Sequence, residues 1–164
     1  MNTYNRLFGS GPVGLAISLV LLFIAIRLRH IYKVPDIFTD GKTVRVLIFC
    51  MFTLAAVIML AAANKALGVK LRGKALITTG VFKYFRHPTY AAFLTFFDFG
   101  LVFLLNNWIF VFWALLLHPV WHFIVSGEEK SLKGVFPGDY EKYCENTGRF
   151  FPRLGIQRKT LKVC

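Results

Sequence analysis

Acidic residues are scarce in this chain. Its 164 residues include 8 Asp and Glu against 20 Lys and Arg, which gives a formal net charge of +12. In a soluble protein, such an excess is typical of nucleic-acid binding. Here the basic residues lie between and after long apolar runs, a pattern that indicates membrane topology and contact with anionic lipid headgroups. We therefore expect no nucleic-acid partner.

Cysteine and histidine are also few. The three cysteines, Cys50, Cys144 and Cys164, form no C-x-x-C pair and no even-numbered framework, so we expect free thiols. The four histidines include no H-E-x-x-H sequence, and they are too few for a membrane di-iron site. We expect no bound metal.

Apolar residues are abundant. They make up 56% of the chain, 18 residues are phenylalanine, and the mean hydropathy is +0.57. A soluble domain of this length rarely carries so much apolar surface. Four apolar blocks, at about residues 12–28, 44–63, 89–105 and 108–125, are long enough to cross a bilayer. The predicted fold class is all-α: a polytopic membrane protein with about four transmembrane helices and a C-terminal helical hairpin.

A two-residue connection joins the third and fourth blocks. Asn106-Asn107 is so short that the two helices must form an antiparallel hairpin. With four spans, the N-terminus, residues 64–88 and residues 126–164 share one membrane side and hold fifteen of the 20 Lys and Arg. Because positive residues gather in the cytoplasm, we expect both termini and an active site formed by these segments to be cytosolic.

Polar residues follow one face of the fourth block. His118, His122, Ser126 and Glu129 fall within about 80° of a helix at 100° per residue, so they should face protein, water or a ligand rather than lipid. Asp98 lies in the middle of the third block, where a hairpin would set it close to His118. We expect an Asp98–His118 contact, and a role of Asp98 in binding a substrate is the alternative.

Two adjacent glutamates mark the end of the fourth block. Glu128 and Glu129 occupy a boundary where Lys and Arg are more usual, and a ligand with an ammonium group or ribose hydroxyls would explain them. The tail that follows has Phe136, Tyr140 and Tyr143 at helical spacing. This spacing predicts a cytosolic, interfacial C-terminal helix.

Three motifs follow one another over about residues 64–153. They are G-x-x-L-I-T-x-G-V-F-K-Y-F-R-H-P-T-Y before a helical hairpin, E-E-x-x-L-x-x-x-F-x-x-x-Y-x-x-Y after it, and then T-G-R-F-F-P. In this order and spacing they resemble the isoprenylcysteine carboxyl methyltransferase family, whose relatives include phospholipid N-methyltransferases. The resemblance implies an integral-membrane enzyme that binds S-adenosyl-L-methionine at the cytosolic end of the hairpin. Its partners would be the lipid bilayer and a lipophilic methyl acceptor, with no obligate protein partner.

The resemblance divides the chain and assigns its residues. Residues 1–63 would form N-terminal transmembrane helices, and residues 64–164 the catalytic core of a single domain. Arg86 and Glu129 are the expected catalytic residues, with Arg86 as a contact for an acidic acceptor. Carried over by position, the cofactor-binding residues are Lys74, Ala75, Leu76, Ile77, Phe82, His87, Pro88, Thr89, Tyr90 and Glu128.

The sequence leaves the methyl acceptor open. Relatives that act on prenylcysteine have an arginine four residues before the first glutamate, where this chain has Ile124. A phospholipid N-methyltransferase is therefore an alternative. A sterol-reductase-like enzyme that binds NADPH has a similar R-H-x-N-Y and E-E-x-x-L layout, although Thr89 replaces its asparagine. A non-catalytic membrane scaffold is a further alternative, but it would be expected to lose the cofactor groups that this chain keeps.

Overall fold

The structure is a computed structural model that describes residues 9–39, 41–67 and 75–153. Within these ranges the secondary structure is helical, and the single β-bridge joins Phe85 to Gly148. Four helices are long and apolar enough to cross a membrane: α2 (Gly11–Tyr32), α3 (Lys42–Leu67), the span Pro88–Leu105 and α6 (Trp108–Val135). The predicted all-α fold with four spans is confirmed.

The third span is built from three helical pieces. Pro88 occupies the first turn of α4 (Pro88–Ala91), where its missing N–H breaks no helical hydrogen bond. A π-helical segment, η3 (Ala92–Phe97), follows, and α5 (Asp98–Leu105) completes the span. The Asp98 N–H donates to the carbonyl of Phe93, five residues back instead of the four of an α-helix, so this turn contains one extra residue.

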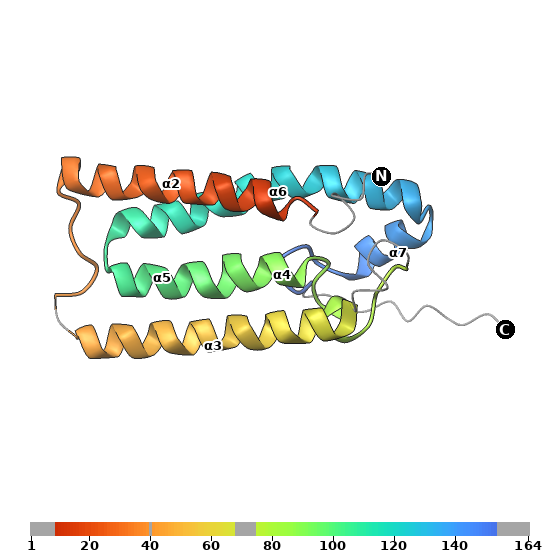
Figure 1. The fold of residues 1–164 in the computed structure, drawn as a ribbon, viewed down its shortest axis with the longest axis horizontal. Coiled ribbons are helices and arrows are strands. Elements are labelled where there is room, and N and C mark those ends of the chain that lie inside the picture. Colours follow the sequence, from red (N-terminus) through yellow and green to blue (C-terminus); the bar gives the residue numbers. More distant parts are fainter. Residues whose placement is uncertain (1–8, 40, 68–74, 154–164) are drawn as a thin grey trace.

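The helices pack in two close pairs. Figure 1 shows α2 running beside α6, and α3 beside α5. The first pair comes very close, because a Cβ added to Gly14 would lie 2.5 Å from a ring carbon of Trp121. The indole N–H of Trp121 donates to Ser18 Oγ at 2.9 Å, so the ring is held in place against α2. Large apolar side chains such as Phe23 and Leu54 remain exposed on the outer faces, as a bilayer requires.

Asn106 and Asn107 form the connection of the hairpin, as predicted. Asn106 ends α5 in a left-handed conformation, and the side chain of Asn107 accepts a hydrogen bond from the Ile109 N–H at the start of α6. Both amides also bind the segment between α2 and α3: Asn106 pairs with the backbone of Phe38, and Asn107 donates to the carbonyl of Val34. These contacts close the end of the bundle that is opposite the polar loops.

The other end of the bundle gathers three segments that are distant in sequence. The N-terminal residues 9–10, the loop with the short helix η2 (Gly80–Lys83), and the C-terminal helix α7 (Asp139–Asn146) all lie there (Figure 1). The predicted C-terminal helix is therefore present. Its aromatic side chains Tyr140 and Tyr143 are buried against the protein.

Candidate active site

A large cavity opens at the polar end and extends between the helices. Its volume is about 750 Å³. The lining includes nine of the ten residues that the resemblance assigns to the cofactor: Ala75, Leu76, Ile77, Phe82, His87, Pro88, Thr89, Tyr90 and Glu128. The tenth, Lys74, lies outside the described residues. Segments from the loop, the third span and α6 thus converge on one space.

The polar end of the cavity is organised around Glu128. One carboxylate oxygen, Oε2, accepts hydrogen bonds from the Tyr90 hydroxyl at 3.1 Å and from the Ser10 N–H at 3.2 Å. The other oxygen, Oε1, lies 4.0 Å from Nδ1 of His87 and has no hydrogen bond within the described part of the chain. His87 stacks on Tyr90 with ring centroids 5.5 Å apart. One acceptor of Glu128 is therefore free to bind a ligand.

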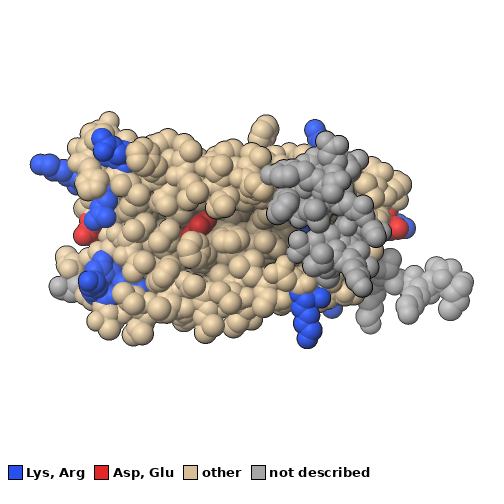
Figure 2. Space-filling view, in the orientation of Figure 1, with Lys and Arg blue, Asp and Glu red and all other residues tan. Residues whose placement is uncertain are grey.

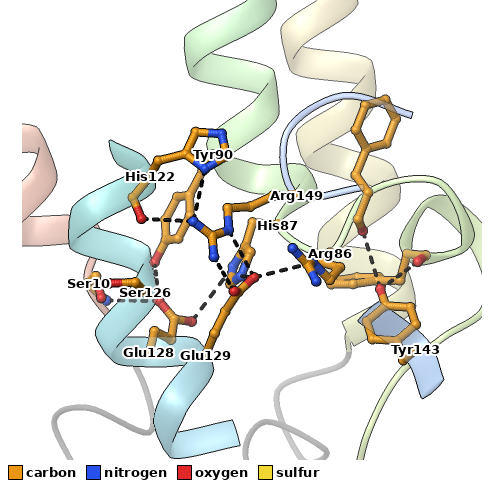
Figure 3. A network of polar contacts seen from close by, with 12 residues as sticks. Ser10, Arg86, His87, Tyr90, His122, Ser126, Glu128, Glu129, Tyr143 and Arg149 are labelled. Carbon is orange, nitrogen blue, oxygen red and sulfur yellow. Dashed lines mark hydrogen bonds and ion pairs between the residues drawn. The ribbon is translucent and has the colours of Figure 1, made fainter. Parts of the chain in front are cut away.

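Glu129 points away from the cavity into a cluster of basic groups. Its side chain is buried, and Arg149 binds both of its oxygens. Nε of Arg86 lies 3.2 Å from Glu129 Oε1, and Nε2 of His87 lies 3.4 Å from the same oxygen. Figure 3 shows these side chains converging on the carboxylate from two segments of the chain, the Arg86-His87 turn and the tail. We call Arg86, His87, Glu129 and Arg149 the Glu129 cluster.

Of the two residues predicted to be catalytic, Arg86 and Glu129, one lines the cavity and the other does not. Arg86 lines the cavity, but Glu129 is absent from its lining. Arg86 was the candidate to bind an acidic acceptor, and the structure pairs both Arg86 and Arg149 with Glu129. The guanidinium of Arg149 also donates to the His122 carbonyl and approaches its Nδ1, so that this nitrogen is an acceptor and the imidazole is neutral. Sequence reasoning missed this pairing because Arg149 lies 20 residues beyond Glu129.

Backbone hydrogen bonds join the tail after α7 to the loop that precedes the third span. The N–H groups of Arg86 and His87 donate to the carbonyls of Gly148 and Arg149, at 2.8 and 3.2 Å. Gly148 is required for the turn that the tail makes here, because a Cβ there would lie 1.8 Å from the Phe151 carbonyl oxygen. This contact explains the glycine of the T-G-R-F-F-P sequence.

Tyr143 is a second link between tail and loop. Its buried hydroxyl donates to the carbonyl of Phe82 at 2.5 Å and approaches that of Phe85 at 3.4 Å. Burial raises the pKa of the Tyr143 hydroxyl well above the ordinary tyrosine range, so the group stays a neutral donor. The loop that lines the cavity is thus bound to α7.

The expected Asp98–His118 contact is wrong. His118 stacks on Phe151 with ring centroids 5.3 Å apart, and its Nδ1 lies 3.1 Å from the Ala114 carbonyl oxygen. Asp98 lines the cavity instead. The prediction matched Asp98 and His118 by their distance from the Asn106-Asn107 connection, and that distance does not fix the side of the helix on which each side chain projects.

Other groups that sequence reasoning missed come from the N-terminal half. Ser10, Leu15 and Ser18 line the cavity although the catalytic core was assigned to residues 64–164. The stretch Gly9-Ser10-Gly11 before the first apolar block carried a signal for this role, since small residues let a backbone approach a ligand closely. In the described ranges, no group of three or more His, Cys, Asp or Glu could hold a metal ion.

Four membrane helices with a cofactor-sized cavity at one end indicate a membrane-embedded enzyme. The chain matches the phospholipid methyltransferase family over residues 43–138, more than half of its length. It therefore belongs to this family of membrane methyltransferases. The matched range includes Arg86, His87, Tyr90, Glu128 and Glu129. No curated protein matches the chain. The family confirms the predicted group of membrane methyltransferases without singling out those that act on isoprenylcysteine.

Proposed function

We propose that the chain is an S-adenosyl-L-methionine-dependent methyltransferase that acts on a lipophilic acceptor within the membrane. The observation that carries this proposal is the convergence of loop residues 75–77, the His87–Tyr90 turn and Glu128 on one cavity. These residues were assigned to the cofactor from the sequence alone. Membership of the phospholipid methyltransferase family supports the same reaction.

The groups at the polar end fit this cofactor. The free Oε1 of Glu128 suits its ammonium group or ribose hydroxyls. The aromatic faces of Tyr90 and Phe82 suit its adenine or its sulfonium. His87 is buried and lies close to both Glu128 and Glu129, and it would donate to the carboxylate of the cofactor. When bound, the cofactor would supply a methyl group activated by a positively charged sulfur.

The chain's own contribution would be positioning and the exclusion of water. The cavity continues from Tyr90 between apolar side chains of three helices, among them Leu19, Phe93 and Trp121. A lipophilic acceptor would enter through this apolar arm and meet the cofactor at the polar end, so that neither reactant has to cross the protein. Bringing two reactants into alignment in a dry site lowers the barrier to an in-line displacement.

Glu129 would act as a positioning residue in this reaction. It holds Arg86 and His87, both of which line the cavity, and it fastens them to the tail through Arg149. Arg86 is then the member of the expected catalytic pair that can reach an acceptor. Since fifteen of the 20 basic residues lie on the side of this end, we propose that it faces the cytosol.

Calorimetry of the purified chain in detergent tests the function. S-adenosylhomocysteine should bind at one site per chain, and NADPH should not bind. Binding of NADPH alone would replace the methyltransferase with the sterol-reductase-like alternative. Binding of neither compound would leave the chain without the proposed cofactor and sink the proposal.

A further inference from the structure

Asp98 is a buried carboxylate without a partner among the described residues. Its residue exposure is 8%, and the structure gives it no hydrogen bond and no ion pair within the described ranges. It lies in the membrane-spanning part of the bundle and lines the apolar arm of the cavity. A charged group in such a place is expensive unless a counter-charge binds to it.

The backbone is built to direct Asp98 into the cavity. Eight residues of uniform α-helix would set Asp98 about 80° around the helix from Tyr90, which also lines the cavity. The extra residue in the η3 turn rotates the following helix back by about 100°. Asp98 then projects within about 20° of Tyr90, on the face that both share with Phe97 and Leu101. Such π-helical turns are frequent at functional sites.

Among the residues that the structure describes, the walls around Asp98 offer no free positive charge. Phe97, Leu101 and Trp113 are apolar neighbours in the cavity lining. The only Lys or Arg among the described lining residues is Arg86, and it is paired with Glu129. Figure 2 shows red acidic atoms in a hollow at the middle of this face, surrounded by tan side chains. A cationic ligand that enters this arm would supply the counter-charge that these described walls lack.

We propose that Asp98 forms a cation subsite in the apolar arm of the cavity, which binds a basic nitrogen on a lipophilic acceptor. That the ligand is a methyl acceptor rests on the proposed function. The subsite itself depends only on Asp98 and its surroundings. A carboxylate and an ammonium that pair inside an apolar space satisfy each other, whereas a carboxylate-bearing lipid would be repelled.

The position of Asp98 separates this subsite from the polar end. Eight residues of helix between Tyr90 and Asp98 correspond to a rise of roughly 12 Å. The subsite therefore recognises the body of the acceptor and leaves the groups around Glu128 to the cofactor. It makes Asp98 a determinant of acceptor specificity, which favours lipophilic amines over neutral or acidic lipids with the same chain.

Binding of matched probes tests the subsite without any methyl transfer. The purified full chain in a neutral detergent is titrated with dodecylamine and, separately, with dodecanol. Tryptophan fluorescence reports binding, because Trp113 and Trp121 line the cavity. We expect the amine to bind at least tenfold more tightly than the alcohol. Asp98→Asn should remove this preference, and Asp98→Glu should restore most of it.

Two controls keep the outcomes separate. Asp36→Asn removes an exposed carboxylate of the α2–α3 connection and should keep the full preference for the amine. S-adenosylhomocysteine binding should be unchanged in Asp98→Asn, which shows that the variant is folded. An equal preference for the amine in wild type and Asp98→Asn, or no preference in wild type, overturns the subsite. If wild type does not bind S-adenosylhomocysteine but prefers the amine, and Asp98→Asn removes that preference, the proposed function is overturned and the subsite stands.

Discussion

Tyr90 and Glu128 are 38 residues apart in sequence and are joined by a 3.1 Å hydrogen bond across the polar end of the cavity. The bond links the first turn of the third span to the last turns of α6. It uses only one oxygen of Glu128, Oε2, which also accepts from the Ser10 N–H. The same contact therefore closes the bundle and leaves a carboxylate oxygen available to a ligand.

Replacement of Glu128 should abolish cofactor binding. In Glu128→Ala, the ligand's ammonium or ribose would be left unpaired in a dry site, and Tyr90 and Ser10 would lose their acceptor. Calorimetry with S-adenosylhomocysteine should then detect no binding. Glu145→Gln is the matched control, because this side chain of α7 is exposed and its replacement should leave the affinity unchanged. If Glu128→Ala binds within about twofold of wild type, a difference of only ~0.4 kcal/mol, the cofactor lies elsewhere.

Replacement of Glu129 should destabilise the chain. In Glu129→Ala, Arg149 and Arg86 lose the carboxylate that they share, and an unpaired buried charge costs about 3–5 kcal/mol. A large fall in the thermal unfolding midpoint in detergent is the expected result. Asp36→Asn breaks the exposed pair with Arg29 but keeps an oxygen that can accept from the Asn107 amide, so it should cost at most about 1 kcal/mol. Equal effects of the two variants would show that the Glu129 cluster does not support the site.

The fold was predictable because its signals are local. The apolar blocks and the Asn106-Asn107 connection each depend on a few neighbouring residues, and the structure has them where expected. The lining of the cavity was predictable for another reason: the order and spacing of its motifs resemble those of a known family. Together they placed Glu128 and the His87–Tyr90 turn in one site.

The incorrect or missed predictions concern contacts that the helical periodicity of the sequence does not reveal. The pairing of Arg149 with Glu129 needs the tail to fold back on the loop, which depends on the turn at Gly148. The direction of Asp98 depends on a π-helical turn, for which Ala92–Phe97 gives no sequence signal. The contribution of Ser10 depends on the packing of α2 against α6. Each is a long-range or register effect, outside the reach of helical periodicity.

Removal of the Tyr143 hydroxyl should loosen the cofactor loop and change its response to alkali. At neutral pH, Tyr143→Phe leaves the buried Phe82 carbonyl without its donor, and we expect a loss of about 1–3 kcal/mol of stability. Burial raises the pKa of Tyr143 in the folded chain, so its contribution is present below the unfolded pKa of about 10 and is lost as the pH rises above it. The stability gap between wild type and variant should therefore narrow above about pH 10. Thermal unfolding at several pH values measures the gap, with the exposed Tyr84→Phe as a control; a gap that is constant with pH would contradict the buried hydrogen bond.

Enlargement of Gly14 should separate α2 from α6 and close the cavity. The Cβ of Gly14→Ala would lie 2.5 Å from the Trp121 ring, which cannot move away freely because its indole N–H binds Ser18. Overpacking of this kind costs about 1–3 kcal/mol, and Trp121 would be pushed toward the cavity that it lines. We expect a lower unfolding midpoint and weaker binding of lipophilic probes. Gly134→Ala, in α6, is the control: a Cβ there meets nothing within 4 Å, so the substitution should stabilise the helix by up to about 1 kcal/mol. If both variants behave alike, helix propensity rather than the contact of Gly14 with Trp121 governs this interface.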